Sequence, residues 1–375
     1  MMWRTNLYDE MSSCEIAKEL AESALLKSII GCKAALCIVG IASITLFLVK
    51  KGLGWLAHPH TQCMFSMHIA YSYLATTFYL ICFITDLIRF GRDHSDPCDY
   101  ALPFPVAFPI RLIAVIGTFG QLFSMAAIAV ERLYASVKPA NYERLNSRCI
   151  KLSSSIVVFV LAVGLNIGLC VPGVRWDEPA HSFTIRTLEN QTRFQMLVNL
   201  EVLLELVVLF VFHFSLFLNF RKKISSTNYV AARYQVTSNK RVIVLLLPVF
   251  WTHFMCISIT SFGLAFYPYL GPEDTPANHG VFLECVAVAP LYAVTLPFIL
   301  FVSLQAPKES ASSFVHGGSI HRGEASSDHS PHMADEHFRN LQTLFAKQEK
   351  ETTTERFVRE GVRSIEAMCC CRVDV

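Results

Sequence analysis

Charged residues are concentrated in short segments between long apolar stretches of the chain. Seven stretches reach about twenty residues, the length that a helix needs to cross the hydrocarbon core of a bilayer. Strict alternation of polar and apolar positions, which marks membrane strands, is absent from them. Helices then satisfy the backbone polar groups inside lipid. The predicted helices span approximately 29–49, 64–88, 105–134, 152–174, 194–220, 242–266 and 281–304.

This pattern predicts an all-α membrane protein, a seven-transmembrane helix bundle. Residues 1–28 form an N-terminal segment, 29–304 the bundle and 305–375 a tail. Composition agrees, because 53% of the residues are hydrophobic and only 17% are charged, whereas soluble domains carry about 25% charged residues. The net charge of +2 gives no electrostatic reason to expect nucleic acid as a partner. The lipid bilayer is the first predicted partner.

Basic residues are enriched in alternate connections between the predicted helices. The first, third and fifth connections carry thirteen Lys and Arg residues, and the other three carry five. Basic connections stay in the cytoplasm. The N-terminus and residues 1–28 are therefore predicted outside, and the C-terminus and the tail inside.

The predicted outer side carries two kinds of modification candidate. The sequon Asn190-Gln191-Thr192 makes Asn190 a candidate for N-glycosylation. Cys14 and Cys98 lie in outer segments, while Cys170 and Cys285 lie near the outer ends of the fourth and seventh helices. Because disulfides persist outside the cell, we expect Cys98 to pair with one of the other three, and the sequence does not choose among them.

An acid and a base lie side by side at the predicted cytoplasmic end of the third helix. Glu131 and Arg132 follow a long uncharged run and precede Tyr134. A guanidinium at the membrane edge is costly to desolvate alone, so a neighbouring carboxylate can hold it in one state. The plainer interpretation is an interfacial anchor, because arginine near a helix end extends its charge to the interface.

The stretch "ERLY" at 131–134 resembles the acid-Arg-aromatic triplet of rhodopsin-like G-protein-coupled receptors, with Leu133 in the usual aromatic position. In that class the acid holds the arginine at rest, and activation frees it to contact the G protein. The seventh helix departs from the class, because it lacks an Asn-Pro-x-x-Tyr sequence. A closer resemblance is to nematode serpentine chemoreceptors of the alpha and alpha/beta classes. It is carried by "SCEIAKELAESALLKSI", "ERLYASVKPANYE" and "AARYQVTSNKRVIVLLLPV".

The resemblance implies a chemosensory receptor in the plasma membrane of sensory neurons, in their cilia, and not an enzyme. Its implied partners are a small environmental or secreted molecule and a heterotrimeric G protein, with Glu131, Arg132 and Tyr134 in coupling. It implies no cofactor and leaves a dimer open. A ligand-gated ion channel or a transporter-like protein is the alternative, although transporters usually show internal repeats, and none is evident.

Charges inside membrane helices are expensive and usually face the bundle interior or a wet cavity. Arg111 precedes Arg132 by 21 residues, about 31 Å of helix, and so lies near the outer face. We predict that Arg111 and one or more of Glu201, Glu205 and Glu284 line an outward-open pocket between helices three, five and seven. A structural ion pair or snorkelling is the competing interpretation.

Histidines and the tail complete the candidates. His68, His213 and His253 lie on three helices without a metal-ligand motif, so packing or cavity-lining roles are expected and no metal site.

The tail begins with a Ser-, Gly- and His-rich segment whose composition predicts disorder. Cys369, Cys370 and Cys371 follow a basic amphipathic segment and are candidates for palmitoylation, with unmodified thiols as the alternative.

Overall fold

The computed structural model describes residues 12–54, 56, 58–142, 148–185, 187, 189–221, 230–270 and 275–305. The predicted tail, with Cys369, Cys370 and Cys371, lies outside the described residues, so palmitoylation stays a prediction.

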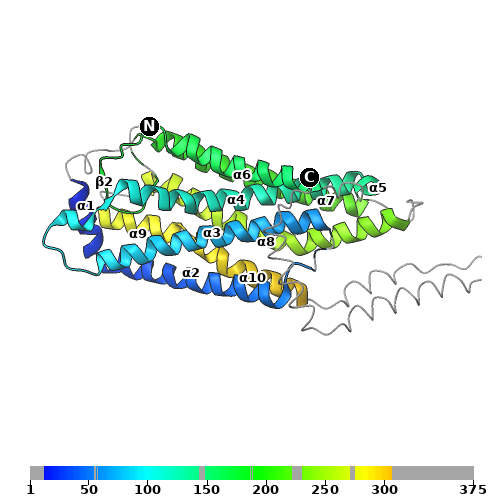
Figure 1. Cartoon of the computed structure of the whole chain (residues 1–375), viewed down its shortest axis with the longest axis horizontal. Coiled ribbons are helices and arrows are strands. Elements are labelled where there is room, and N and C mark those ends of the chain that lie inside the picture. The colour runs from blue at the N-terminus through cyan, green and yellow to red at the C-terminus, as the bar shows by residue number, and fades with distance from the viewer. Residues whose placement is uncertain are drawn as a thin grey trace, which may run out of the picture. The chain divides into compact units, whose positions relative to one another are not determined.

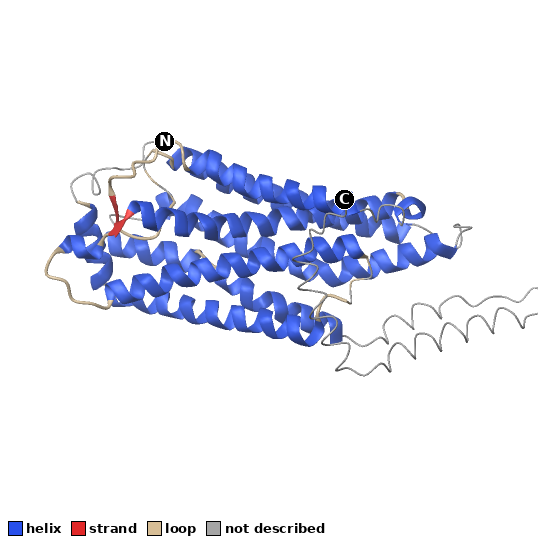
Figure 2. Cartoon of the chain, viewed as in Figure 1, coloured by secondary structure: helices blue, strands red, loops and turns tan. Residues whose placement is uncertain are grey.

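Seven membrane-length apolar helices are present among the described residues, which confirms the predicted number and fold class (Figure 2). The seventh consists of two helices with a break at Ala287–Val288. Pro290 lies one residue after the first residue of α10, where a missing N–H is tolerated. The spans are α2 (Ala24–Lys51), α3 (Pro59–Phe90), α4 (Phe104–Val137), α6 (Arg148–Cys170), α7 (Gln191–Arg221), α8 (Val230–Leu270), and α9 (Pro276–Val286) with α10 (Ala289–Gln305).

The short elements lie in the connections. Helix α1 (Ser13–Glu22) begins with a capping box, in which the Ser12 hydroxyl accepts from the Glu15 N–H and the Glu15 carboxylate accepts from the Ser12 N–H. Turn η1 (Pro97–Tyr100) precedes strand β1 (Leu102–Pro103), which pairs antiparallel with β2 (Pro179–Ala180). Figure 1 shows α1 and β2 at the same end of the bundle. Helix α5 (Pro139–Tyr142) follows α4.

Helix α4 lies at the centre of the bundle and contacts α3, α6, α7 and α8. Small residues allow its closest approaches. A Cβ added to Gly117 would lie 2.8 Å from the Cβ of Ala75 on α3, and one added to Gly120 would overlap the ring of Tyr71. Small residues at helix contacts let backbones approach closely in lipid, where van der Waals packing drives association.

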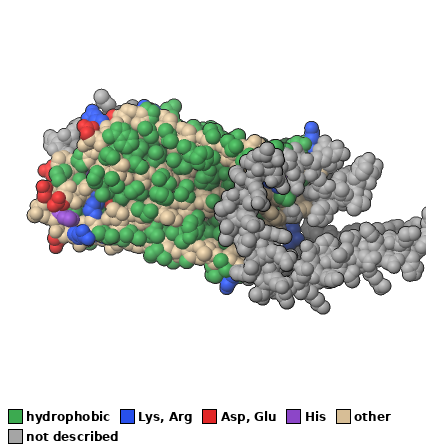
Figure 3. Space-filling view, viewed as in Figure 1, with side chains coloured by type: hydrophobic (Ala, Val, Ile, Leu, Met, Phe, Trp, Pro, Cys, Tyr) green, Lys and Arg blue, Asp and Glu red, His purple; other side chains and the backbone are tan. Residues whose placement is uncertain are grey.

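The flanks of the bundle are apolar. Large side chains such as Phe210 (69% exposed), Val130 (63%) and Phe159 (56%) point away from the core. Figure 3 shows hydrophobic side chains spread over the visible face, with charged side chains towards the two ends and Asp and Glu at the α1 end. Such a surface would be a liability in water and is suited to acyl chains. It supports seven membrane-spanning helices.

Candidate functional site

Glu131 and Arg132 are buried together in the last turns of α4. Their side chains form an ion pair, with Arg132 Nη2 and Glu131 Oε1 2.9 Å apart. Glu131 is 8% exposed and Arg132 is 2% exposed. The pair therefore belongs to the packed interior at this end of the bundle, and a purely interfacial anchor would instead reach water.

The Glu131 carboxylate has hydrogen-bond partners on α3, on α5 and just before α3. Thr61 Oγ1 on α3 lies 2.9 Å from each carboxylate oxygen, and the Tyr142 hydroxyl on α5 donates over 2.5 Å. His58 Nδ1, just before α3, lies 3.1 Å from Oε1. His60 Nδ1 lies 3.4 Å from the same oxygen. Burial raises the pKa of Tyr142, so its hydroxyl keeps the proton that it donates. The carboxylate is thus contacted by five neighbours, including Arg132.

The Arg132 guanidinium joins α4 to α3 and α8. Nη1 donates to Asn239 Oδ1 on α8 over 3.0 Å, and Nη2 donates to Thr61 Oγ1 over 2.7 Å. The Asn239 amide nitrogen in turn donates to Ser136 Oγ on α4, which also accepts from Asn219 on α7. We call Thr61, Glu131, Arg132, Tyr142 and Asn239 the α4 cluster.

Tyr142 contacts the ion pair, and the coupling role of Tyr134 stays a prediction. Tyr134 is partly exposed, whereas Tyr142 is 1% exposed and its hydroxyl contacts both members of the ion pair. Pro139 starts α5 and so returns the chain to the end of α4. Tyr142 lies within the stretch "ERLYASVKPANYE". Its contact with Glu131 depends on the fold of the connection, which the stretch alone does not predict.

Two of the carboxylates predicted to line one pocket, Glu205 and Glu284, contact different partners. Glu284 on α9 pairs with Lys33 on α2, with 2.5 Å between Oε2 and Nζ. Glu205 on α7 instead contacts His253 on α8, with 2.6 Å between Oε1 and Nδ1. The guanidinium of Arg111 lies 4.7 Å from the centre of the Tyr79 ring. Glu205 and Glu284 thus each have a close partner, and Glu201 is buried, at 7% exposure. The single outward-open pocket lined by these charges stays a prediction.

A second polar cluster crosses the middle of the bundle and was not predicted as a unit. His253 Nε2 lies 3.1 Å from Gln121 Oε1, and His68 Nε2 lies 2.6 Å from the Tyr292 hydroxyl. His68 Nδ1 lies 3.2 Å from the main-chain oxygen of Gln121, which can only accept. His68 therefore donates from Nδ1 and accepts from Tyr292. We call Glu205, His253, Gln121, His68 and Tyr292 the mid-bundle network.

A small cavity lies beside this network, between α3, α4, α8 and α10. Three network members, Gln121, His253 and Tyr292, line it, together with Tyr79. The cavity-lining role considered for the histidines therefore applies to His253. Among the described residues, no group of three or more His, Cys, Asp or Glu side chains is placed to hold a metal ion.

Comparison with known proteins decides the family. The family described as the serpentine type 7TM GPCR receptor class ab chemoreceptors matches residues 11–321. The chain belongs to this family. The receptor also resembles the crystal structure of squid rhodopsin, with a TM-score of 0.56 and 16% identity over 82% of this chain and 90% of that chain. At this identity the likeness concerns the fold alone. None of the curated proteins compared with the receptor matches it.

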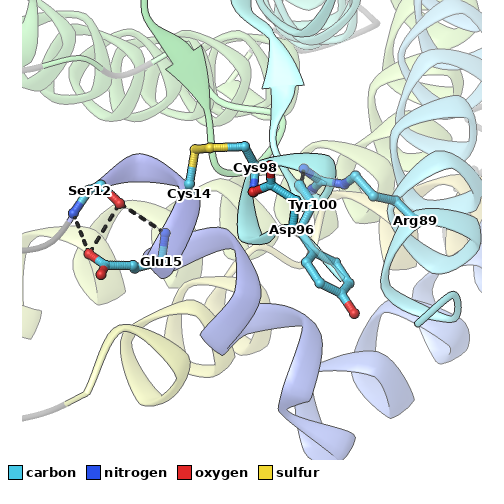
Figure 4. The surroundings of a disulfide bond; sticks show 7 residues. All are labelled: Ser12, Cys14, Glu15, Arg89, Asp96, Cys98 and Tyr100. Carbon is cyan, nitrogen blue, oxygen red and sulfur yellow. Dashed lines mark hydrogen bonds between the residues drawn. A yellow bond between two sulfur atoms is a disulfide. The ribbon is translucent and has the colours of Figure 1, made fainter. Parts of the chain in front are cut away.

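The receptor holds its N-terminal helix by a disulfide between Cys14 on α1 and Cys98 on η1 (Figure 4). Their Cα atoms are 4.5 Å apart. Cys170 is a buried free thiol and Cys285 an exposed one. Glu19 adds a second link, since its carboxylate accepts from the Ala277 N–H in the first turn of α9 over 3.2 Å. Helix α1 is thus fixed both to η1 and to the start of α9.

The receptor buries the predicted glycosylation site. Asn190 is 0% exposed, and its side-chain nitrogen donates to the main-chain oxygens of Cys170 and Ile185 over 2.9 and 2.7 Å. A glycan is attached through this same nitrogen. Because Nδ2 is enclosed and occupied by two hydrogen bonds, the fold argues against a glycan at Asn190.

Proposed function

We propose that the receptor binds a small environmental or secreted molecule within the outer half of its bundle and activates a heterotrimeric G protein. Family membership supports this function over an ion channel or a transporter. Plasma membrane and ciliary localisation in sensory neurons belong to the same proposal. The Cys14–Cys98 disulfide supports an outer position for the α1 end, since disulfides persist outside the cell.

The observation that carries the proposal is the hydrogen bond from Arg132 to Asn239, which joins α4 to α8. While it is made, the guanidinium is enclosed and the two helices are held together. A ligand that favours a separated arrangement of α4 and α8 would release the guanidinium for contact with the G protein. A ligand shifts such an equilibrium only by its differential affinity for the two arrangements.

Ligand-evoked GTP exchange tests this proposal. The receptor is expressed in cells, and calcium responses to a chemical panel identify an activating compound, which is then used with purified G protein. We expect Arg132→Ala to reach the cell surface and to lose evoked exchange. Arg132→Lys serves as the matched variant, because it keeps the charge but loses the planar fork whose Nη1 contacts Asn239 while Nη2 contacts Thr61.

Glu131→Gln is expected to raise basal exchange, because the neutral amide no longer pairs with Arg132. Full evoked exchange by Arg132→Ala would instead make the pair a packing element only. An evoked current that persists when G-protein exchange is blocked would restore the channel alternative.

A further inference from the structure

We infer that His58 and His60 form a proton-binding site beside the α4 cluster, and that acid shifts the receptor toward the arrangement in which Arg132 is released. The inference rests on the proposed function, in which release of Arg132 accompanies activation. It adds a regulator of that step, because a proton taken up from water replaces Arg132 as the cation beside Glu131.

Both histidines direct the same ring nitrogen at one carboxylate oxygen. Nδ1 of His58 lies 3.1 Å from Glu131 Oε1, and Nδ1 of His60 lies 3.4 Å from it. The two histidine side chains are 15% and 10% exposed, so both are largely enclosed with the carboxylate. An ionised carboxylate only accepts hydrogen bonds, so each Nδ1 carries a proton. Nε2 is then the nitrogen at which either ring takes up a further proton.

Glu131 Oε1 has more neighbours than it can bond at once. Arg132 Nη2, Thr61 Oγ1 and the Tyr142 hydroxyl all lie within 2.9 Å of it, in addition to the two histidines. His60 is the neighbour left without a bond, since its Nδ1 is buried and has no hydrogen-bond partner among the described residues. Departure of Arg132 would free a place on this oxygen for His60 Nδ1.

Positive charge on two sides opposes protonation of the histidines at rest. Arg132 is already paired with Glu131, and α3 begins at Pro59, between the two histidines. A helix N-terminus carries a partial positive charge. When Arg132 leaves, the enclosed Glu131 carboxylate loses its cation, which is costly, and an imidazolium restores an ion pair. The released arrangement therefore binds a proton more tightly than the resting one, so a lower pH favours it.

The neighbours of the two rings accommodate either protonation state. Ser154 Oγ on α6 lies 3.3 Å from His60 Nε2. Its hydroxyl can donate to the neutral ring or accept from the imidazolium. The His58 ring packs against the Tyr142 ring with 4.2 Å between their centroids, and an aromatic face attracts a cation. Proton uptake thus leaves neither ring without a partner.

No other cation of the described residues competes for the carboxylate. Its ion-pair partners are Arg132 and the two histidines. Lys151 on α6 forms no ion pair with it among the described contacts. Lys240 on α8 lies 3.8 Å from the centre of the Phe220 ring, and Arg241 is exposed. The histidines are therefore the groups placed to replace Arg132.

Histidine NMR of the full-length receptor in lipid nanodiscs tests the site without a G protein. The signals of His58 and His60 are assigned from His58→Gln and His60→Gln. We expect the titration midpoint of at least one of them to lie about one pH unit higher in Arg132→Ala than in the wild type, because a nearby cation is removed. Glu131→Gln should move it to lower pH, because the anion is removed.

His94 is the internal control, since it lies near Asp99 and away from the α4 cluster. Its midpoint should be the same in all these variants, which also reports on an intact fold. Midpoints of both histidines that are unchanged in Arg132→Ala and in Glu131→Gln would overturn the inference.

Basal GTP exchange at pH 7.5 and pH 6.0 tests the consequence, after subtraction of the exchange that the G protein shows without receptor. We expect exchange by the wild type to rise by about threefold or more at pH 6.0, because a difference of one pH unit in proton affinity allows at most tenfold. The double variant His58→Gln/His60→Gln should lose this rise. His94→Gln is the matched control and should keep it.

An equal rise in the double variant would overturn the inference. Raised basal exchange in Glu131→Gln, without an acid response in the wild type, would refute the inference and keep the proposed function. The expected NMR shifts in a receptor that never drives GTP exchange would keep the proton site and refute the proposed function.

Discussion

At the scale of single residues, Asn190 is a structural side chain at the start of α7. Its main-chain oxygen accepts from the Phe194 N–H, while its side-chain nitrogen bonds Cys170 and Ile185. We expect Asn190→Ala to lower the free energy of unfolding by about 1–3 kcal/mol, because two buried oxygens lose their donor. Thermal unfolding of purified receptor measures this change.

Thr192→Ala is the matched control, because it destroys the sequon but changes an exposed side chain in the first turn of α7. It should leave both stability and electrophoretic mobility as in the wild type. A glycosidase-sensitive mobility shift in the wild type, absent from Thr192→Ala, would contradict the structural role.

We expect His181 to make the β1–β2 end of the receptor sensitive to acid. Burial and the nearby Arg89 cation lower the pKa of His181 from 6.5 to about 4. Its main-chain oxygen accepts from Arg89, which also contacts Asp86. Above pH 6.5 the imidazole is neutral whether folded or unfolded. Between pH 6.5 and 4 only the unfolded loop takes up the proton, so stability falls as pH falls.

Hydrogen exchange of residues 179–183 is therefore expected to be faster at pH 5 than at pH 7, after correction for intrinsic rates. His181→Gln should remove most of the difference, because glutamine does not titrate. An equal difference in that variant would assign the pH effect to other groups.

The sequence could predict the ion pair between adjacent residues, whereas it could not predict hydrogen bonds or ion pairs between residues far apart in the chain. Glu131 and Arg132 are neighbours in the chain, and their ion pair needs only one helix turn. Asn239 lies 107 residues from Arg132, and an uncharged amide in a long helix carries no motif. Likewise, Glu205 and Glu284 were recognised as costly charges, but the sequence does not show that His253 and Lys33 are their partners.

At the scale of elements, α1 is attached to two parts of the structure that are far apart in the sequence. The Cys14–Cys98 disulfide joins it to η1, and Glu19 contacts the start of α9. Cys14→Ser should lower the thermal midpoint of the receptor, and Cys98→Ser should lower it equally. The double variant should lower it no further, because both single changes remove the same bond.

Cys285→Ser is the control, since Cys285 is an exposed free thiol and its loss breaks no covalent link. Additive effects of Cys14→Ser and Cys98→Ser would show that the two cysteines act separately.

The apolar pattern predicted the seven spans but not their interruptions. Helix α7 runs unbroken through Glu201 and Glu205, because both carboxylates are buried within the bundle rather than exposed to lipid. The break at Ala287–Val288 depends on Thr260 of α8, which bonds both sides of it. The bridging residue comes from another helix and leaves no local pattern in the seventh span.

At the scale of the whole molecule, two polar clusters occupy different depths of one bundle. The α4 cluster joins α3, α4, α5 and α8, while the mid-bundle network joins α3, α4, α7, α8 and α10. Helices α3, α4 and α8 take part in both. A change in the packing of α8 at the cavity would therefore reach Asn239 through one continuous helix, since rigid elements with two arrangements transmit such coupling.

The most direct test of this account is the basal GTP exchange of Asn239→Leu. Leucine has a similar size but accepts no hydrogen bond from Arg132. A hydrogen bond to a charged group contributes about 1.5–3 kcal/mol, so we expect basal exchange to rise by roughly tenfold or more unless the active fraction saturates. Asn166→Leu is the matched control, because Asn166 is equally buried but its amide donates to Ala162 within its own helix. It should leave basal exchange unchanged. Basal exchange of Asn239→Leu equal to that of the wild type and Asn166→Leu, at matched surface expression, would contradict the claim that Arg132 and Asn239 restrain the receptor.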